Sequence, residues 1–116
     1  MPYSDAGKDA SLNGIAAAGT FISVHSADPG RTGASQSSTN RVATTWGANT
    51  GTGATRAKPG SQVGVAMPAG SSGSHFGVWT AASGGTFICG YPLSQTETFT
   101  GAGTLDVTPT LTAPDA

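Results

Sequence analysis

From residue 20 to residue 112 the chain repeats one pattern, in which a short stretch of alternating apolar and polar residues is followed by turn-forming residues. The clearest stretch is Val63–Met67, where every second residue is large and apolar. Alternation with a period of two places the apolar side chains on one face of a β-strand. Repeated short strands separated by turns predict an all-β fold, an antiparallel β-sandwich or flattened barrel of about seven short strands.

The stretches expected to form strands share this alternation or a high content of β-branched and aromatic residues. They are Thr20–Ser26, Arg41–Trp46, Val63–Met67, His75–Thr80, Thr86–Gly90, Thr96–Thr100 and Thr104–Thr112. Pro92 is expected to interrupt the chain after the fifth strand, and Pro109 places the last strand at a sheet edge or a bulge, because proline has no backbone N–H. The polar stretches Arg31–Asn40 and Gly47–Ser61 are expected to be loops.

One short helix is expected before the first strand, within Ser4–Ala18. Ser4 or Asp5 can cap its N-terminus, and Leu12 and Ile15 share one face at helical spacing. The glycines in this segment weaken the helix by roughly 1 kcal/mol each relative to alanine.

Large apolar side chains are scarce, since Val, Ile, Leu and Phe together make only 17 of the 116 residues. A chain of this length forms one domain, so residues 1–116 are expected to fold as a single β-sandwich with a flexible tail at 113–116. At least one tryptophan is expected to join the buried core. The other expected core residues are Ile22, Val24, Val63, Val65, Phe76, Val78, Phe87, Leu105 and Val107.

Charge and the length of the apolar stretches exclude two classes of partner. Five basic and six acidic residues give a net charge of −1, which is too little positive charge for a nucleic-acid surface. No stretch approaches the roughly 20 apolar residues that span a bilayer, so we expect no membrane partner. The single cysteine, Cys89, cannot form an intrachain disulfide, which indicates folding in a reducing cytoplasm.

No group of residues in the sequence points to catalysis. His25 and Asp28 lie three residues apart but lack the further ligands that a metal needs, and nothing places His75 near them. We therefore expect no enzyme activity, catalytic residue, cofactor or metal, and interpret the histidines as surface or strand-face residues. Trp46 and Trp79 allow a carbohydrate-binding face, although core packing is the more common role of large aromatic side chains.

The order of several short motifs resembles small virion structural proteins of tailed bacteriophages, mainly those of actinobacterial hosts. The motifs are Ala16–Gly30 with its His-Ser-Ala-Asp-Pro-Gly turn, Thr32–Ala34, Arg41–Gly47, Pro68–Gly70, His75–Trp79 and Gly84–Phe87. Members of this family are usually labelled tail fibre or minor tail proteins, and the resemblance also allows a place on the capsid shell. The resemblance implies a structural role on the virion surface and carries no catalytic residue.

Within that family, the small size of the chain favours capsid decoration, because fibres are usually built from longer or repeated chains. A tail fibre or tail-tip protein is the alternative, and a host-glycan-binding module is a further one. The expected partners are other virion proteins, such as major capsid or tail subunits, together with further copies of the chain in a homo-oligomer. Such contacts supply burial that 116 residues cannot supply alone.

Basic residues gather in or beside the two polar loops, whereas four of the six acidic residues lie near the chain ends. This asymmetry favours a mildly basic loop face turned toward an acidic neighbour, with ordinary solvated loops as the alternative. The expected assembly contacts are Tyr3, Arg31, Arg41, Arg56 and Lys58.

Overall fold

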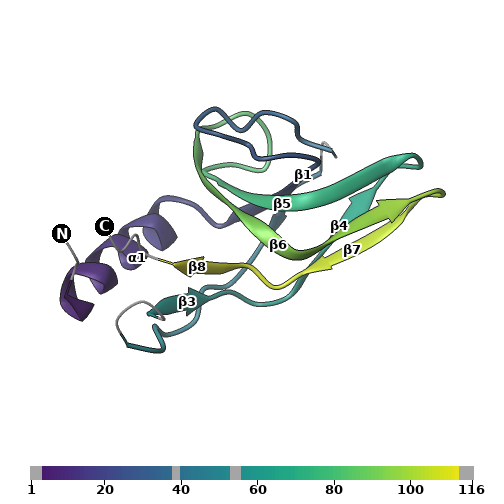
Figure 1. Ribbon diagram of the computed structural model, residues 1–116. Helices are drawn as coiled ribbons and strands as arrows, with labels where there is room; N and C mark the ends of the chain where they lie inside the picture. Colours follow the sequence, from purple (N-terminus) through teal and green to yellow (C-terminus); the bar gives the residue numbers. More distant parts are fainter. Residues whose placement is uncertain (1–3, 38–39, 53–55, 113–116) are drawn as a thin grey trace.

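The computed structural model describes residues 4–37, 40–52 and 56–112. Within these residues one helix precedes eight strands (Figure 1). They are α1 (Asp5–Ala18), β1 (Phe21–His25), β2 (Val42–Ala43), β3 (Ala57–Pro59), β4 (Val63–Met67), β5 (Ser71–Trp79), β6 (Phe87–Phe99), β7 (Gly103–Val107) and β8 (Thr110–Thr112).

The expected helix is confirmed with its cap. The hydroxyl oxygen of Ser4 accepts a hydrogen bond of 3.1 Å from the backbone N–H of Gly7, which satisfies one free donor of the first turn. The helix ends at Gly19, where a Cβ atom would lie 2.6 Å from the carbonyl oxygen of Trp79, so close packing requires glycine there. No helix in the described part of the chain is long and apolar enough to cross a membrane.

The strands pair only in antiparallel fashion, in one four-stranded sheet of order β2-β1-β5-β6 and two pairs, β4-β7 and β3-β8. In Figure 1 the β4-β7 pair lies across from β5 and β6, and the β3-β8 pair lies beside α1. The arrangement is sandwich-like, which confirms the expected fold class.

The expected interruption at Pro92 is wrong, because β6 continues through it for thirteen residues. Pro92 still pairs with His75 of β5, but the next paired residues are Glu97 and Gly73. Four residues of β6, numbers 93–96, therefore stand opposite one residue of β5, and this bulge adjoins the proline. The missing N–H of Pro92 is tolerated because regular pairing stops there.

Other boundaries also differ from expectation, since β2 covers only Val42–Ala43 of the expected Arg41–Trp46 and β5 begins at Ser71 rather than His75. The stretch Thr104–Thr112 forms β7 and β8, separated at Thr108 and Pro109, because the two halves pair with different strands. The polar stretch Gly47–Ser61 contains β3, which pairs with β8 from Ala57 opposite Thr112 onward. Ala-Lys-Pro has no apolar alternation, so only tertiary pairing makes β3 a strand.

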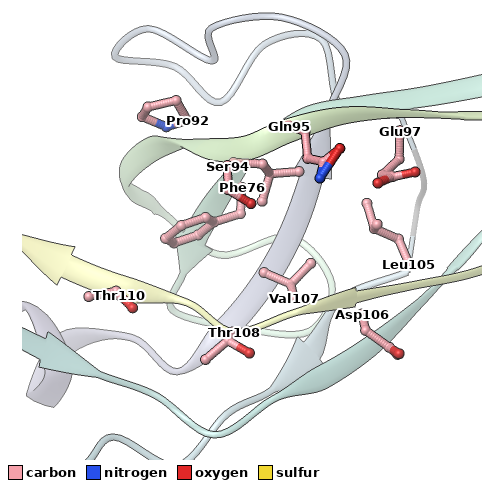
Figure 2. A pocket seen from close by; sticks show the side chains of 11 residues that line it. Phe76, Pro92, Ser94, Gln95, Glu97, Leu105, Asp106, Val107, Thr108 and Thr110 are labelled. Atoms are coloured by element: carbon pink, nitrogen blue, oxygen red, sulfur yellow. The ribbon is translucent and has the colours of Figure 1, made fainter.

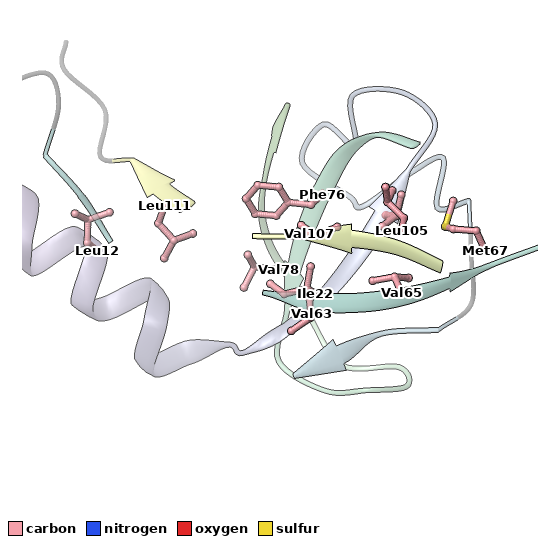
Figure 3. Close-up of a cluster of buried hydrophobic side chains, with 11 residues drawn as sticks. Leu12, Ile22, Val63, Val65, Met67, Phe76, Val78, Leu105, Val107 and Leu111 are labelled. Atoms are coloured by element: carbon pink, nitrogen blue, oxygen red, sulfur yellow. The ribbon is translucent and has the colours of Figure 1, made fainter. Parts of the chain in front are cut away.

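Figure 3 shows the core between the sheets, with Leu12 of α1 and Leu111 of β8 at the helical end. Phe87 is a correction to the expected core, since it is only half-buried and stacks edge-on against Trp79 at 5.2 Å between ring centroids. Both tryptophans are half-buried, and Trp46 packs against the core. The buried set is Leu12, Ile22, Val24, Val63, Val65, Met67, Phe76, Val78, Leu105, Val107 and Leu111.

Candidate functional site

A chain of buried hydrogen bonds crosses β1 and β5. The indole N–H of Trp79 donates to Ser23 Oγ at 2.8 Å, and Ser23 Oγ lies 2.6 Å from Nε2 of His25. The other ring nitrogen, Nδ1, lies 2.7 Å from the carbonyl oxygen of Ala34. Because a carbonyl only accepts, Nδ1 carries the proton, and the Ser23 hydroxyl donates to Nε2.

The interpretation of His25 as a surface or strand-face residue is corrected here, because His25 and Ser23 are both fully buried. Burial lowers the pKa of His25 below its ordinary value of 6.5, although the hydrogen bond to Ala34 opposes this shift. The serine–histidine pair cannot meet a substrate in this enclosed position. Its geometry is that of a structural network that fixes β1 against β5.

The predicted contact residue Arg41 holds the hairpin between β5 and β6. Its Nη1 donates to the carbonyl oxygens of Ala81 at 3.1 Å and Gly84 at 2.7 Å, and its guanidinium lies 3.6 Å from the centroid of the Trp79 ring. Burial lowers the pKa of Arg41 from its ordinary value. This side chain therefore closes a turn of its own chain and covers one face of the Trp79 ring.

The predicted contact residues Arg56 and Lys58 connect β3 to α1. Arg56 forms a two-bond pair with Asp9, with Nε at 2.7 Å from Oδ1 and Nη2 at 2.8 Å from Oδ2. This pairing lowers the pKa of Asp9 and raises that of Arg56. Lys58 donates to the side-chain oxygens of Asn13 at 3.1 Å and Asn49 at 3.2 Å. Arg56 and Lys58 therefore both have partners within the chain.

Arg31 differs from the other basic residues of the predicted face, since it is exposed and has no hydrogen bond or ion pair to any described residue. It sits in a tight turn, where the carboxylate of Asp28 accepts from Gly30 N at 2.9 Å and the carbonyl oxygen of Pro29 accepts from Gly33 N at 3.0 Å. Pro29 is buried. The turn thus presents Arg31 on a well-supported loop.

Tyr3, the remaining predicted contact, lies outside the described residues. Of the predicted contacts within the described residues, only Arg31 has a charged group with neither a hydrogen bond nor an ion pair to a described residue. The internal pairing of Arg41, Arg56 and Lys58 gave no signal in the sequence, because their partners lie far along the chain. The role of all these residues as assembly contacts stays a prediction.

A groove that sequence reasoning missed lies between β6 and β7 (Figure 2). Its volume is about 530 Å³, within the range of sites that receive a ligand. In Figure 2 the side chains of Gln95 and Glu97 point from β6 toward Leu105 and Val107 of β7, and Phe76 lies at the back. The groove therefore has an apolar floor and a polar, acidic upper wall.

The groove exists because β6 and β7 follow each other in the chain but do not pair. β6 pairs with β5 and β7 pairs with β4 among the described strands. The two strands stay close at one end, where a Cβ atom on Gly103 would lie 2.9 Å from the Phe99 ring. At the other end the Tyr91 hydroxyl donates to the carbonyl oxygen of Thr112 at 2.9 Å. The groove is thus bounded at both ends and open between them.

Two potentially reactive side chains lie on β6 just before the residues that line the groove, and burial shifts the pKa of both. Burial raises the pKa of the Cys89 thiol to about 11, so it stays protonated and poorly nucleophilic at neutral pH. Burial also raises the pKa of Tyr91 to about 12. Among the described residues, no three His, Cys, Asp or Glu side chains are grouped as metal ligands.

Comparison with known proteins assigns the family. Searches of curated proteins and of solved structures return no significant match. A family model described as podophage GP4 fiber I protein gp80 matches residues 8–111. The matched span runs from the first half of α1 into β8 and so includes all the strand pairs and the β6–β7 groove. The chain belongs to the podophage GP4 fiber I protein gp80 family.

Proposed function

We propose that this chain is a non-enzymatic structural subunit of a tail fibre on the surface of a phage virion, and that it works as a homo-oligomer bound to other virion proteins. The observation that carries the proposal is the family match over residues 8–111, because it spans nearly the whole described fold rather than one motif. The family description names a fibre protein.

The structure supports a role in which chemistry is not required. The histidine–serine pair is enclosed, and the cysteine has a raised pKa. Three basic side chains that are predicted assembly contacts also hold turns and elements together within the chain. These are the features of a rigid building block, whose polar residues serve the fold.

The two alternatives receive less support. Capsid decoration rests on the small size of the chain, and the family description favours a fibre instead. Glycan binding through Trp79 would need a bare ring face, but Arg41 covers one face of that ring and Phe87 lies against its edge. The indole N–H of Trp46 is bonded to the carbonyl oxygen of Gly19 at 2.9 Å and is not free for a sugar.

The test is to locate and count the chain in purified virions. Gold-labelled antibodies against the chain are expected to mark tail fibres in electron micrographs, and quantitative mass spectrometry is expected to give tens of copies per particle. Labelling spread over the capsid with hundreds of copies would support decoration and overturn the proposal. Antibodies against the major capsid protein serve as the matched control for label access.

A further inference from the structure

The β6–β7 groove is built by an irregularity of the strand rather than by loose packing. Residues 93–96 form the bulge of β6, and several of them line the groove. Ser94, Gln95 and Glu97 are exposed, although Gln95 and Glu97 point toward the other sheet (Figure 2). Bulges of this kind re-aim side chains at sheet edges and next to binding sites.

The groove carries negative charge that the described chain leaves unpaired. Glu97 and Asp106 both line it, and neither side chain has an ion pair or hydrogen bond to a described residue. In Figure 2 the carboxylate of Glu97 points into the groove, whereas that of Asp106 points away from β6. Beside Glu97 lie Leu105 and Val107, which are buried and form an apolar floor. A carboxylate above an apolar floor suits a side chain with an aliphatic stem and a cationic end, which is the chemistry of arginine or lysine.

The same chain offers one matching group. Arg31 is exposed and unpaired among the described residues, and its turn is anchored on both sides. A Cβ atom on Gly90 would lie 2.4 Å from the ring of Pro29, and one on Gly33 would lie 2.5 Å from the Trp79 ring. The turn therefore packs tightly against the sheet, so its backbone needs little ordering when the exposed Arg31 side chain binds.

We propose that the Arg31 turn of one copy inserts into the β6–β7 groove of the next copy and places its guanidinium beside Glu97. This inference deepens the proposed homo-oligomeric fibre subunit and rests on it. Within one molecule the two parts do not meet, because Arg31 is not among the residues that line the groove. In Figure 1 the loop after β1 lies on the far side of β6 from β7.

Such a contact is heterologous, since it joins two different surfaces of the same chain. Heterologous contacts build closed rings or open filaments, whereas an isologous contact stops at a dimer. A filament built in this way keeps a free groove on the subunit at one end and a free turn on the subunit at the other end. All its subunits therefore point in the same direction. The interface therefore gives a fibre subunit a defined polarity.

The experiment measures self-association of the full chain by sedimentation velocity over a range of concentrations. The wild type is expected to form concentration-dependent oligomers, and Arg31→Glu or Glu97→Arg is expected to weaken association at least roughly tenfold. The double variant, which exchanges the two charges, is expected to restore oligomers. Glu97→Gln tests the charge of the groove, and Asp5→Asn is its matched control. Each change removes one negative charge, but Asp5 lies on α1 away from the groove.

Mixing the two single variants distinguishes a contact between Arg31 and Glu97 from other modes of self-association. In the mixture the intact turn of the Glu97→Arg copy meets the intact groove of the Arg31→Glu copy, and the two reversed charges also face each other. The mixture is therefore expected to form oligomers that neither single variant forms alone. Thermal unfolding of each variant checks that the fold is intact. A wild type that stays monomeric, or single variants that associate like the wild type, would overturn the inference. Binding of the groove to another virion protein or to a sugar, with no self-association, would also overturn it.

A failure of this contact can be told apart from a failure of the proposed function. A chain that labels tail fibres in virions but shows no dependence on Arg31 and Glu97 would leave the fibre role standing and remove only this contact. A chain that self-associates through Arg31 and Glu97 but labels the capsid would remove the fibre role and keep the contact.

Discussion

At the scale of single residues, burial decides what a polar side chain does. His25 has a titratable ring, but it is enclosed between Ser23 and the carbonyl oxygen of Ala34, and both ring nitrogens have partners. A buried polar group is costly unless it is bonded, so this histidine contributes to the fold only in its neutral form. Arg56 is a similar case, since its charge is balanced by Asp9 of α1.

The neutral state of His25 makes stability depend on pH. The folded pKa lies below the ordinary value of 6.5, so the unfolded chain binds the proton first as pH falls. The free energy of unfolding is expected to be constant above that value and to fall below it, down to the folded pKa. Melting temperatures measured from pH 7.5 to about 4.5 check this, and His25→Gln is expected to flatten the decline while His75→Gln keeps it. An identical decline in His25→Gln would contradict the assignment.

Phe76 anchors the core at the point where the groove begins. It is 4% exposed and stacks on Tyr91 with 5.6 Å between ring centroids. Phe76→Ala is expected to lower the free energy of unfolding by roughly 3–5 kcal/mol, because it removes a large buried side chain and leaves a cavity. Urea unfolding measures this loss. A loss under about 1 kcal/mol, the size typical of surface positions, would place Phe76 outside the core.

At the scale of elements, the strands are shaped by where regular pairing fails. β6 bends away from β5 after Pro92, and the chain between β7 and β8 changes partner at Pro109. Each proline lies where a ladder hydrogen bond is absent, so proline costs little there. The hairpin between β5 and β6 is closed by a backbone hydrogen bond from Thr80 N to the carbonyl oxygen of Thr86 at 3.0 Å, and the side chain of Arg41 holds its turn from outside.

Two glycine-to-alanine changes are expected to act in opposite directions. A Cβ atom on Gly14 of α1 meets nothing within 4 Å, so Gly14→Ala is expected to stabilise the protein by about 1 kcal/mol through helix propensity. A Cβ atom on Gly73 of β5 would lie 2.5 Å from Val24 and 2.9 Å from Leu105. Gly73→Ala is expected to cost roughly 1–3 kcal/mol through overpacking between the sheets. Chemical denaturation compares them directly, and equal effects would contradict this packing.

Arg41→Lys is expected to loosen the β5–β6 hairpin. Lysine keeps the charge but loses the planar group that reaches the two carbonyl oxygens and stacks on Trp79, at a cost of about 1–2 kcal/mol. Hydrogen exchange of the turn amides at residues 83–86 is expected to accelerate. Arg31→Lys is the control and is expected to change neither quantity. Unchanged exchange in Arg41→Lys would show that Arg41 does not hold the turn.

At the scale of the whole molecule, the fold is elongated, with extents of 44 × 27 × 23 Å. The helix and the β3-β8 pair occupy one end, and the Asp9–Arg56 pair joins α1 to β3 there (Figure 1). The Arg31 turn and the β6–β7 groove lie on the sandwich itself. The chain has few large apolar residues. Its Asp9–Arg56 charge pair and its buried Ser23–His25 hydrogen bond lie where they connect elements of the fold.

Trypsin tests which surface is covered in the virion. In the free protein the first cut is expected after Arg31, because Arg56 is ion-paired and the Lys58–Pro59 bond resists cleavage by its proline. In intact virions this bond is expected to be protected, which mass spectrometry of the fragments measures. Arg31→Gln removes the site and serves as the control. Equal cleavage in both settings would show that the Arg31 turn is not a contact surface.

The amino-acid sequence by itself determined the elements whose signals are local. The cap at Ser4, the alternation of Val63–Met67 and the glycine-containing turns act within a few residues, so the all-β class, the helix and most of the core followed from them. The resemblance to phage virion proteins also came from motif order, and the family match supports it at the level of a phage fibre protein.

Only the tertiary structure decided the features that depend on distant partners. β3 is a strand because β8 lies beside it, and β6 bulges because four of its residues face one residue of β5. His25 bonds to the carbonyl oxygen of Ala34, nine residues away, and Arg41 and Arg56 bond to Ala81 and Asp9, which lie 40 and 47 residues away. Long-range pairing and burial are properties of the assembled sheets, so no local pattern around these residues carries them.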